Sequence, residues 1–273
     1  MKKIICVIGG DKRNDELINI LRDKGYVVKV YDGRVNLREF LSDSTCVVSG
    51  IPFSRDNETI NAPNLSEKVD IEELFMSMGE GKILIAGSFS DKIKSLAQRY
   101  KIRLYDFLDD EDFAVYNAIP TAEGAIEIAM RKTEKTINSS NCLVLGYGRI
   151  GKVLADLLKG LHADITVTAR KDEHIAWIKA MGYKYKKYSE LKESLKDFDI
   201  IFNTVPALII KKEELENIRK DSLIIDLSSK PGGIDFEFAK EKGINAELAL
   251  GLPGKVAPKS VAEYMANKVI NVN

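Results

Sequence analysis

The stretch from Asn141 to Leu161 constrains the fold more than any other part of the chain. An apolar run, Cys142–Leu145, leads directly into three glycines spaced GxGxxG, and these open an amphipathic segment. In that context the first glycine permits a tight turn, the second lets the backbone approach a pyrophosphate, and the third lets helix and strand pack closely. The stretch predicts a Rossmann dinucleotide site at the start of a helix. Its predicted phosphate-binding residues are Gly146, Tyr147, Gly148, Arg149, Ile150 and Gly151.

Short apolar runs alternate with amphipathic, charge-rich segments along the rest of the chain. The strand candidates are Lys3–Ile8, Val27–Tyr31, Thr45–Ser49 and Lys82–Ala86, and then Cys142–Leu145, Ile165–Thr168, Ile200–Asn203, Leu223–Leu227 and Ile244–Leu248. Such β-α-β series form parallel sheets that helices cover on both faces. The sequence therefore predicts an α/β protein with two doubly wound parallel-sheet domains, the second of which is a Rossmann dinucleotide-binding domain.

The pattern restarts near Pro120, and proline suits the first turn of a helix. We expect a substrate-side α/β domain over residues 1–119, a linking helix and the Rossmann domain over 120–256, and a C-terminal helix over 257–273 that packs back across the cleft. The polar stretch Ile51–Val69 holds two prolines and has no periodicity. We interpret it as a long loop, and loops of that length are usually functional or mobile.

Composition excludes several classes of function. Lys plus Arg and Asp plus Glu both number 41, and the net charge of zero argues against a nucleic acid or a membrane surface as partner. The apolar part of the N-terminus is too short for a signal peptide, which favours the cytoplasm. Cys6, Cys46 and Cys142 each sit in an apolar run and are expected to be buried thiols. With two histidines in the chain, neither near a cysteine in sequence, no metal site is expected.

The end of the second strand of the Rossmann domain indicates which dinucleotide is bound. An NAD enzyme usually has Asp or Glu there to bind the ribose 2′-hydroxyl. This chain has Arg170 and Lys171 instead, with Thr168 just before them. A guanidinium beside an ammonium suits a 2′-phosphate, so the sequence predicts NADP. The alternative is that Arg170 stacks on adenine without discriminating between the two cofactors.

The predicted strand Ile200–Asn203 of the same domain ends at Asn203 and leads into Thr204, Val205 and Pro206. In dinucleotide folds this loop reaches the nicotinamide side, where its polar groups could bind the ribose or the carboxamide. The alternative is an ordinary turn at a strand end.

A substrate of such a protein is expected at the carboxyl ends of both sheets. Small, hydroxyl and cationic residues gather there, and they suit a small carboxylate. We predict that Ser228, Lys230, Lys255 and Arg13 act on the substrate, Arg13 by projecting from the turn after Gly9 and Gly10. Solvated surface charges are the alternative. His162 lies in a helix-to-strand turn and His174 follows the cofactor arginine, which disfavours a histidine-based 2-hydroxy acid dehydrogenase.

Six segments together resemble a known family. They read VIGGDKR, AVYNAIPTAEGAIEIAM, VLGYGRIGKVLA, FNTVPALII, DLSSKPGGIDF and GLPGKVAPKS. In this order, along nearly the whole chain, they resemble the A subunit of dipicolinate synthase from spore-forming bacteria. The resemblance implies formation of dipicolinate (pyridine-2,6-dicarboxylate) from a dihydrodipicolinate-level product of the lysine pathway, with NADP as oxidant. It also implies a partner, the flavoprotein-like B subunit, with a homo- or hetero-oligomer as the assembly and the mother-cell cytoplasm during sporulation as the setting.

Two alternatives stay open at the level of sequence. The first is an NADP-dependent reductase of another small carboxylate, of the shikimate-dehydrogenase type. That class usually has a Lys–Asp pair in its N-terminal domain, and no clear equivalent is present here. The second is a non-catalytic nucleotide-binding subunit that regulates a partner.

Overall fold

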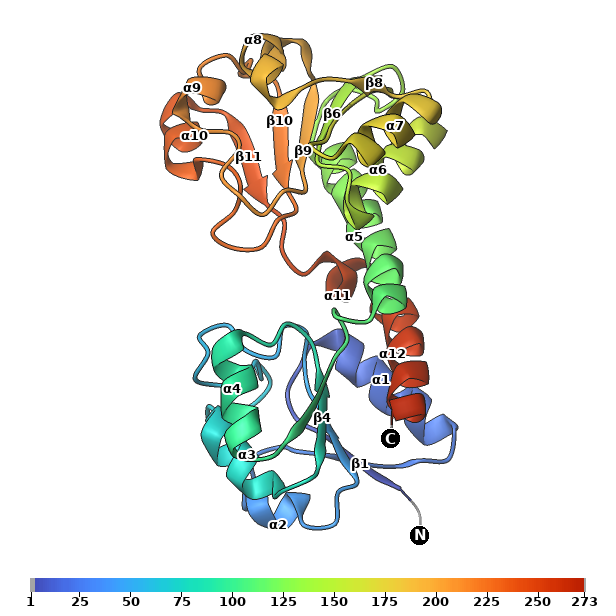
Figure 1. Ribbon diagram of the computed structural model, residues 1–273, viewed down its shortest axis with the longest axis vertical. Helices are drawn as coiled ribbons and strands as arrows, with labels where there is room; N and C mark the ends of the chain where they lie inside the picture. The colour runs from blue at the N-terminus through green and yellow to red at the C-terminus, as the bar shows by residue number, and fades with distance from the viewer. Residues whose placement is uncertain (1–2, 273) are drawn as a thin grey trace. The chain divides into compact units, whose positions relative to one another are not determined.

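Each half of the chain builds one parallel sheet (Figure 1). The computed structural model describes residues 3–272. Within them, unit 1 comprises the chain up to Tyr116 together with the chain from Ala257 onward, and unit 2 comprises Asn117–Val256. The predicted fold class, α/β with two doubly wound parallel sheets, is confirmed.

Unit 1 has strand order β2-β1-β3-β4-β5, with every neighbouring pair parallel. Its strands are β1 (Ile4–Val7), β2 (Val27–Val30), β3 (Cys46–Val48), β4 (Ile83–Ala86) and β5 (Arg103–Asp106). Its helices up to residue 99 are α1 (Lys12–Asp23), α2 (Leu37–Leu41), α3 (Ile71–Met78) and α4 (Asp91–Arg99). The apolar residues of α1, Leu17, Ile18 and Leu21, lie at helical spacing and are all buried against the sheet.

The C-terminal helix α12 (Pro258–Val272) belongs to unit 1, where it packs along α1 (Figure 1). Its residues Val261, Met265 and Val269 recur every four positions and are fully buried in the same core as Leu17. Lys268 lies on the neighbouring part of the helix surface and pairs with Asp110 at 2.8 Å. This helix therefore completes the core of unit 1.

Unit 2 has strand order β11-β10-β9-β6-β7-β8, again fully parallel. Its strands are β6 (Asn141–Leu145), β7 (Asp164–Thr168), β8 (Lys184–Tyr185), β9 (Ile200–Asn203), β10 (Leu223–Asp226) and β11 (Asn245–Leu248). Its helices after residue 148 are α6 (Arg149–Gly160), α7 (Asp172–Ala180), α8 (Leu191–Ser194), α9 (Lys212–Leu215), α10 (Phe236–Lys242) and α11 (Leu252–Val256). Numbered within the unit, this order is 6-5-4-1-2-3, the Rossmann order, with its switch point between β6 and β9.

One boundary expectation is wrong. Helix α5 (Glu111–Lys132) does not start at Pro120 but contains it. It starts nine residues earlier because Asp110 caps it: its carboxylate accepts a hydrogen bond from the Phe113 N–H at 3.2 Å. Pro120 has no N–H to donate to the carbonyl of Tyr116 one turn before it. The chain passes from unit 1 to unit 2 at that turn, after Tyr116.

The cysteines are buried in strands, as expected. Burial raises the pKa of Cys6 to about 11 and the pKa of Cys46 and of Cys142 to about 12, so the thiols stay protonated and unreactive at neutral pH. Between residues 3 and 272, no helix combines the length and apolarity of a membrane span. The same part of the chain contains no group of three or more His, Cys, Asp or Glu arranged to hold a metal.

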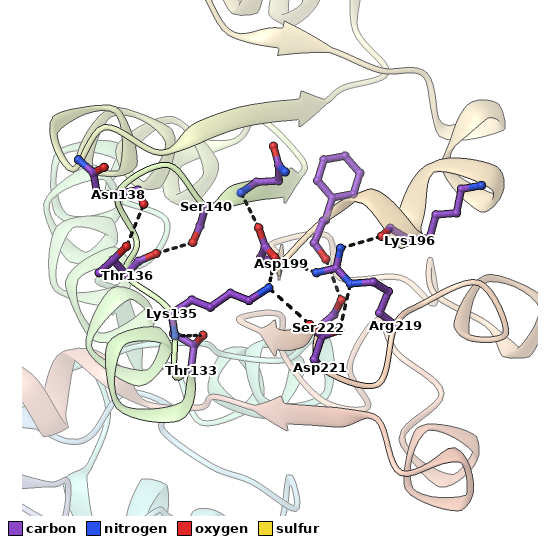
Figure 2. A network of polar contacts seen from close by, with 12 residues as sticks. Thr133, Lys135, Thr136, Asn138, Ser140, Lys196, Asp199, Arg219, Asp221 and Ser222 are labelled. Atoms are coloured by element: carbon purple, nitrogen blue, oxygen red, sulfur yellow. Dashed lines mark hydrogen bonds and ion pairs between the residues drawn. The ribbon is translucent and has the colours of Figure 1, made fainter.

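A polar network ties together the amino-terminal edge of the sheet of unit 2 (Figure 2). Asp199, just before β9, accepts hydrogen bonds from Lys135 Nζ at 2.7 Å, Arg219 Nη2 at 2.8 Å and the Asn141 N–H at 2.9 Å. Arg219 also binds Asp221, just before β10, at 3.0 Å. The network fixes the segment between α5 and β6 to the starts of three strands, at the edge opposite the glycine turn.

Candidate dinucleotide-binding site

The three glycines of the turn after β6 differ in their surroundings. Gly146 has φ +96°, and a Cβ there would lie 2.6 Å from Thr204 Oγ1. A Cβ on Gly151 would lie 2.2 Å from the carbonyl oxygen of Gly146. A Cβ on Gly148 would meet no atom of residues 3–272 within 4 Å. The first and third glycines are thus required by the fold, whereas the second borders open space, as a turn that receives a pyrophosphate must.

Helix α6 starts at this open position without a cap. Gly148 is its N-cap residue, no side chain in the described part of the chain caps the backbone there, and the first turn contains no acidic residue. The backbone N–H groups and the helix dipole at such an end attract anions. The residues present therefore fit a dinucleotide pyrophosphate.

The side chain of Tyr147 does not line this open space. It is 6% exposed, and its ring packs edge-on against His174 and Tyr183 at centroid distances of 6.1 and 6.4 Å. Ile150 packs against the same core. The side chains of Tyr147 and Ile150 therefore pack in the hydrophobic core, and at these two positions only the backbone of the turn is available to a ligand.

Arg170 and Lys171 follow β7 and are both exposed. Lys171 is the N-cap residue of α7, and no described side chain caps that helix either. Two cations therefore lie together at the carboxyl end of β7, and the first turn of α7 beside them also carries Asp172 and Glu173. The guanidinium and the ammonium are the groups there that suit a phosphate.

Thr168 plays a different part from the one expected of a ligand contact. It is fully buried, and its hydroxyl accepts a hydrogen bond from the N–H of Gly146 at 3.2 Å. Tyr188 lies beside it. Burial raises the pKa of the Tyr188 phenol above its ordinary value, and its hydrogen bond to Thr168 and the charge of Arg170 offset part of that rise. Thr168 therefore holds the glycine turn against β7 from inside the fold.

The loops after β9 and β10 are joined into one body. The amide of Asn203 is fully buried and donates to Asp226 Oδ1 at 2.8 Å and to the carbonyl of Val205 at 3.1 Å, while its oxygen accepts from the N–H of Val205. The carboxylate of Asp226 also accepts from the N–H groups of Ser228 at 2.9 Å and Gly233 at 2.6 Å. We call these two segments, Asn203–Ile210 and Asp226–Asp235, the β9–β10 platform.

Some of the predicted cofactor-binding residues in this platform are hydrogen-bonded within the fold, and others lie on its surface. Asn203 has its amide committed within the platform, and Thr204 donates its hydroxyl to the last carbonyl of β6, that of Leu145, at 2.8 Å. Val205 packs near Gly146, and Pro206 is exposed. The Asn203 amide is fully used within the platform, whereas the Thr204 hydroxyl donates one hydrogen bond and keeps its capacity to accept, so contact between these side chains and a cofactor stays a prediction. Sequence patterns also miss Asp226, whose partners include a residue on another strand.

Ser228, Ser229 and Lys230 follow Asp226. Ser228 is 4% exposed, and its hydroxyl is buried without a hydrogen-bond partner among residues 3–272. Ser229 and Lys230 are exposed.

Lys255 lies elsewhere in unit 2, on α11, where it lines a cavity of about 500 Å³ together with Glu127 and Arg131 of α5 and Glu247 of β11. Leu252 packs α11 onto α5 against Gly124.

The corresponding edge of unit 1 is closed, which corrects the expectation for Arg13. Arg13 is 3% exposed and does not project: its guanidinium binds both oxygens of Asp11, at 2.9 and 2.7 Å, and donates to the carbonyl of Ile51. The N–H of Gly10 donates to the carbonyl of Asn61 at 2.9 Å, and a Cβ on Gly9 would lie 2.7 Å from Ala62 Cβ. The loop Ile51–Val69 thus packs on this turn, and its Asn61 carbonyl takes the backbone N–H of Gly10 that a phosphate would otherwise bind.

Both units match known protein families, and one relative matches along nearly the whole chain. Residues 4–108 match the family described as the N-terminal domain of the dipicolinate synthase A subunit, and residues 127–246 match shikimate / quinate 5-dehydrogenase. The A subunit of dipicolinate synthase from Bacillus subtilis (strain 168) is 34% identical over 276 residues, covering 96% of this chain and 93% of the relative.

Solved structures agree with the sequence comparison. The crystal structure of the dipicolinate synthase A subunit from Bacillus halodurans has TM-score 0.89 at 29% identity, covering 100% of this chain and 98% of that one. The A chain of dipicolinate synthase from Bacillus subtilis has TM-score 0.88 at 32% identity, covering 100% and 96%. With a dehydrogenase-type dinucleotide-binding unit and this likeness along its whole length, the chain belongs to the family of dipicolinate synthase A subunits.

Proposed function

We propose that this protein is an NADP-dependent dehydrogenase that forms dipicolinate from dihydrodipicolinate. The observation that carries the proposal is the open, uncapped glycine turn at Gly148 together with the exposed pair Arg170 and Lys171 at the end of the next strand. The family membership supports dipicolinate as the product, because the relatives are named for dipicolinate synthesis.

The choice of NADP rests on charge at the end of β7. An NAD site places a carboxylate there, and a carboxylate would repel a 2′-phosphate. Here Arg170 offers a guanidinium that can bind phosphate in bidentate fashion, and the backbone at the start of α7 offers N–H donors beside it. Arg149, in the first turn of α6, adds a further positive charge near the pyrophosphate.

The chemistry needs few groups from the protein. Bound NADP supplies a hydride acceptor. Loss of a hydride and a proton turns a dihydropyridine ring into an aromatic pyridine, and aromatisation supplies driving force, so a strong catalytic base is not required. The protein's task is to hold a dicarboxylate, and we assign this task to cationic and hydroxyl residues of unit 2: Ser228 and Lys230 in the loop after β10, and Lys255 on α11.

The naming of the relatives as one of several subunits indicates a larger assembly. The partner that we propose is a flavoprotein-like B subunit, with both proteins acting in the mother-cell cytoplasm during sporulation, on a branch of the lysine pathway. A homo- or hetero-oligomer follows from such an arrangement.

The direct test follows NADPH formation spectroscopically after mixing the protein with freshly prepared dihydrodipicolinate. We expect NADPH to form from NADP, NADH to form much more slowly from NAD, and the product to be dipicolinate by mass spectrometry. The assay is run with and without the B subunit. Absence of turnover in both cases, with cofactor binding intact, would instead favour the non-catalytic nucleotide-binding role.

A reductase of another small carboxylate is the second candidate, and the match of residues 127–246 to shikimate / quinate 5-dehydrogenase favours it. Its test uses the same protein with shikimate or quinate as substrate. Turnover of either at a rate exceeding that of dihydrodipicolinate would replace the first proposal.

A further inference from the structure

Asp226 is a buried carboxylate that the dinucleotide reaction does not itself use. It ends β10, is fully buried, and receives three N–H donors, from Asn203, Ser228 and Gly233, at 2.8, 2.9 and 2.6 Å. Two of these donors belong to its own loop, and the third belongs to the loop after β9. Asp226 thus ties the two halves of the β9–β10 platform together at their base.

The platform is also closed at its far end. The N–H groups of Ile209 and Ile210 both donate to the carbonyl of Gly233, at 2.9 and 3.0 Å, and the Asp235 N–H donates to the carbonyl of Ile210 at 2.9 Å. The packing leaves no spare room: a Cβ on Gly233 would lie 2.3 Å from Asn203 Nδ2. The two loops are therefore hydrogen-bonded to each other at both ends, at the base through the Asp226 carboxylate.

The place of this platform follows from the strand order. The pyrophosphate turn follows β6, and the cationic pair Arg170 and Lys171 follows β7, on one side of β6. Strands β9 and β10 lie on the other side. A dinucleotide bound at the switch point between β6 and β9 has its adenosine half toward β7 and its other half toward β9 and β10.

Resting on the proposed function, we infer that Asp226 is a positioning residue for the nicotinamide half of the cofactor. It acts through the backbone of the platform, whose exposed surface includes the apolar residues Pro206, Ala207 and Leu208 and the polar pair Ser229 and Lys230. The adenosine half would be held by the glycine turn, which Thr168 braces from inside the fold, and by the cations after β7. Asp226 forms its hydrogen bonds with Asn203, Ser228 and Gly233 and not with the glycine turn, so its substitution should affect the nicotinamide half more than the adenosine half.

The test compares two ligands on Asp226→Asn. The amide is nearly isosteric, but one of its two terminal groups is a donor and cannot accept the hydrogen bonds now made to the carboxylate. NADP carries both halves of the cofactor, whereas 2′,5′-ADP carries only the adenosine half with its phosphates. By calorimetry we expect NADP to bind about tenfold more weakly and 2′,5′-ADP to bind within about twofold of the unaltered protein. The fluorescence of bound NADPH should shift toward that of free NADPH, since its nicotinamide ring loses its fixed surroundings.

Asp221→Asn is the matched control. It removes the same charge just before the same strand, at the opposite edge of the sheet, where Asp221 binds Arg219. It should leave both affinities and the fluorescence unchanged. If Asp226→Asn does not fold, as judged by circular dichroism, Gly233→Ala perturbs the same contact from the other side and carries the same expectation.

Three results overturn the inference or its basis. Equal loss of affinity for NADP and 2′,5′-ADP would make Asp226 a general structural residue. Unchanged affinities and fluorescence would mean that the platform does not hold the nicotinamide. Failure of the unaltered protein to bind either ligand would refute the proposed function itself.

Discussion

The carbonyl oxygen of Gly146 lies where a side chain of Gly151 would begin: a Cβ on Gly151 would be 2.2 Å from that oxygen. The start of α6 and the end of β6 therefore touch through bare backbone. Gly148 lies between these two residues in sequence, yet a Cβ there meets no described atom within 4 Å. Two glycines of one motif are thus required by the fold, and the third borders open space, where we propose that the pyrophosphate binds.

This difference predicts opposite outcomes for two otherwise identical substitutions. Gly148→Val should leave a folded protein with no measurable dinucleotide binding, because the side chain occupies the pyrophosphate position. Gly151→Val should destabilise unit 2 by several kcal/mol, on the order of other severe overpacking. Thermal unfolding and calorimetry on both variants check this. A Gly148→Val protein that binds NADP normally would place the site elsewhere.

Arg170→Gln should separate the two cofactors. Loss of one charge-assisted contact weakens NADP binding by about 1–3 kcal/mol and leaves the weaker NAD binding nearly unchanged. Lys184→Gln is the matched control, because Lys184 is an exposed cation paired with Asp164 at 3.0 Å at the amino edge of the sheet. Calorimetric titration with both cofactors gives the answer. Equal affinity of the unaltered protein for NAD and NADP would contradict the assignment.

Lys230 and Lys255 should matter for substrate and not for cofactor. For each, substitution by Ala is expected to lower kcat/KM by about tenfold to a few hundredfold, the effect of one lost ionic hydrogen bond, with NADP affinity unchanged. Lys240→Ala, at an exposed position of α10, serves as control. Steady-state kinetics with near-normal kcat/KM in both variants would show that both lysines are solvated surface charges.

The network around Asp199 should make unit 2 sensitive to acid. Burial raises the pKa of Asp199, but hydrogen bonds from Lys135, the Asn141 N–H and Arg219 outweigh burial and hold the pKa below its ordinary value of 3.8. A carboxylate with a lowered pKa in the folded state contributes stability above its unfolded pKa, and that contribution is lost as pH falls through the folded value. Asp199→Asn should therefore cost about 1–3 kcal/mol at neutral pH, and the difference should shrink below about pH 4.

Urea unfolding of the Asp199 variant across this pH range measures the effect. Asp164→Asn removes a carboxylate from an exposed ion pair at the same edge of the sheet and should cost little at any pH. A constant difference between the unaltered protein and Asp199→Asn down to about pH 3 would show that the lost stability does not come from the charge of Asp199.

Some site residues can be predicted from sequence because their roles are local. The glycine turn depends on three backbone positions within six residues, and the strand before it is recognisable from its apolar run. Arg170 and Lys171 can be placed because a fixed number of residues separates the glycines from the end of the next strand. The sequence pattern places the start of helix α5 too late, because proline is common at helix starts, whereas here Asp110 caps the helix and Pro120 lies inside it.

The sequence by itself determined the two parallel sheets, nine of the eleven strands that the structure describes and the position of the glycine turn, since these follow from the periodicity of buried residues and from local backbone needs. The edge strands β5 and β8, whose residues are only partly buried, have no counterpart among the predicted strands. Only the tertiary structure decided which polar groups remain available to a ligand. The guanidinium of Arg13 is hydrogen-bonded to Asp11 and to the carbonyl of Ile51, and the amide of Asn203 is hydrogen-bonded to Asp226, a residue 23 positions away. Partners of that kind meet only when the chain folds, and a buried polar group must be paired because leaving it unpaired for a ligand costs too much free energy.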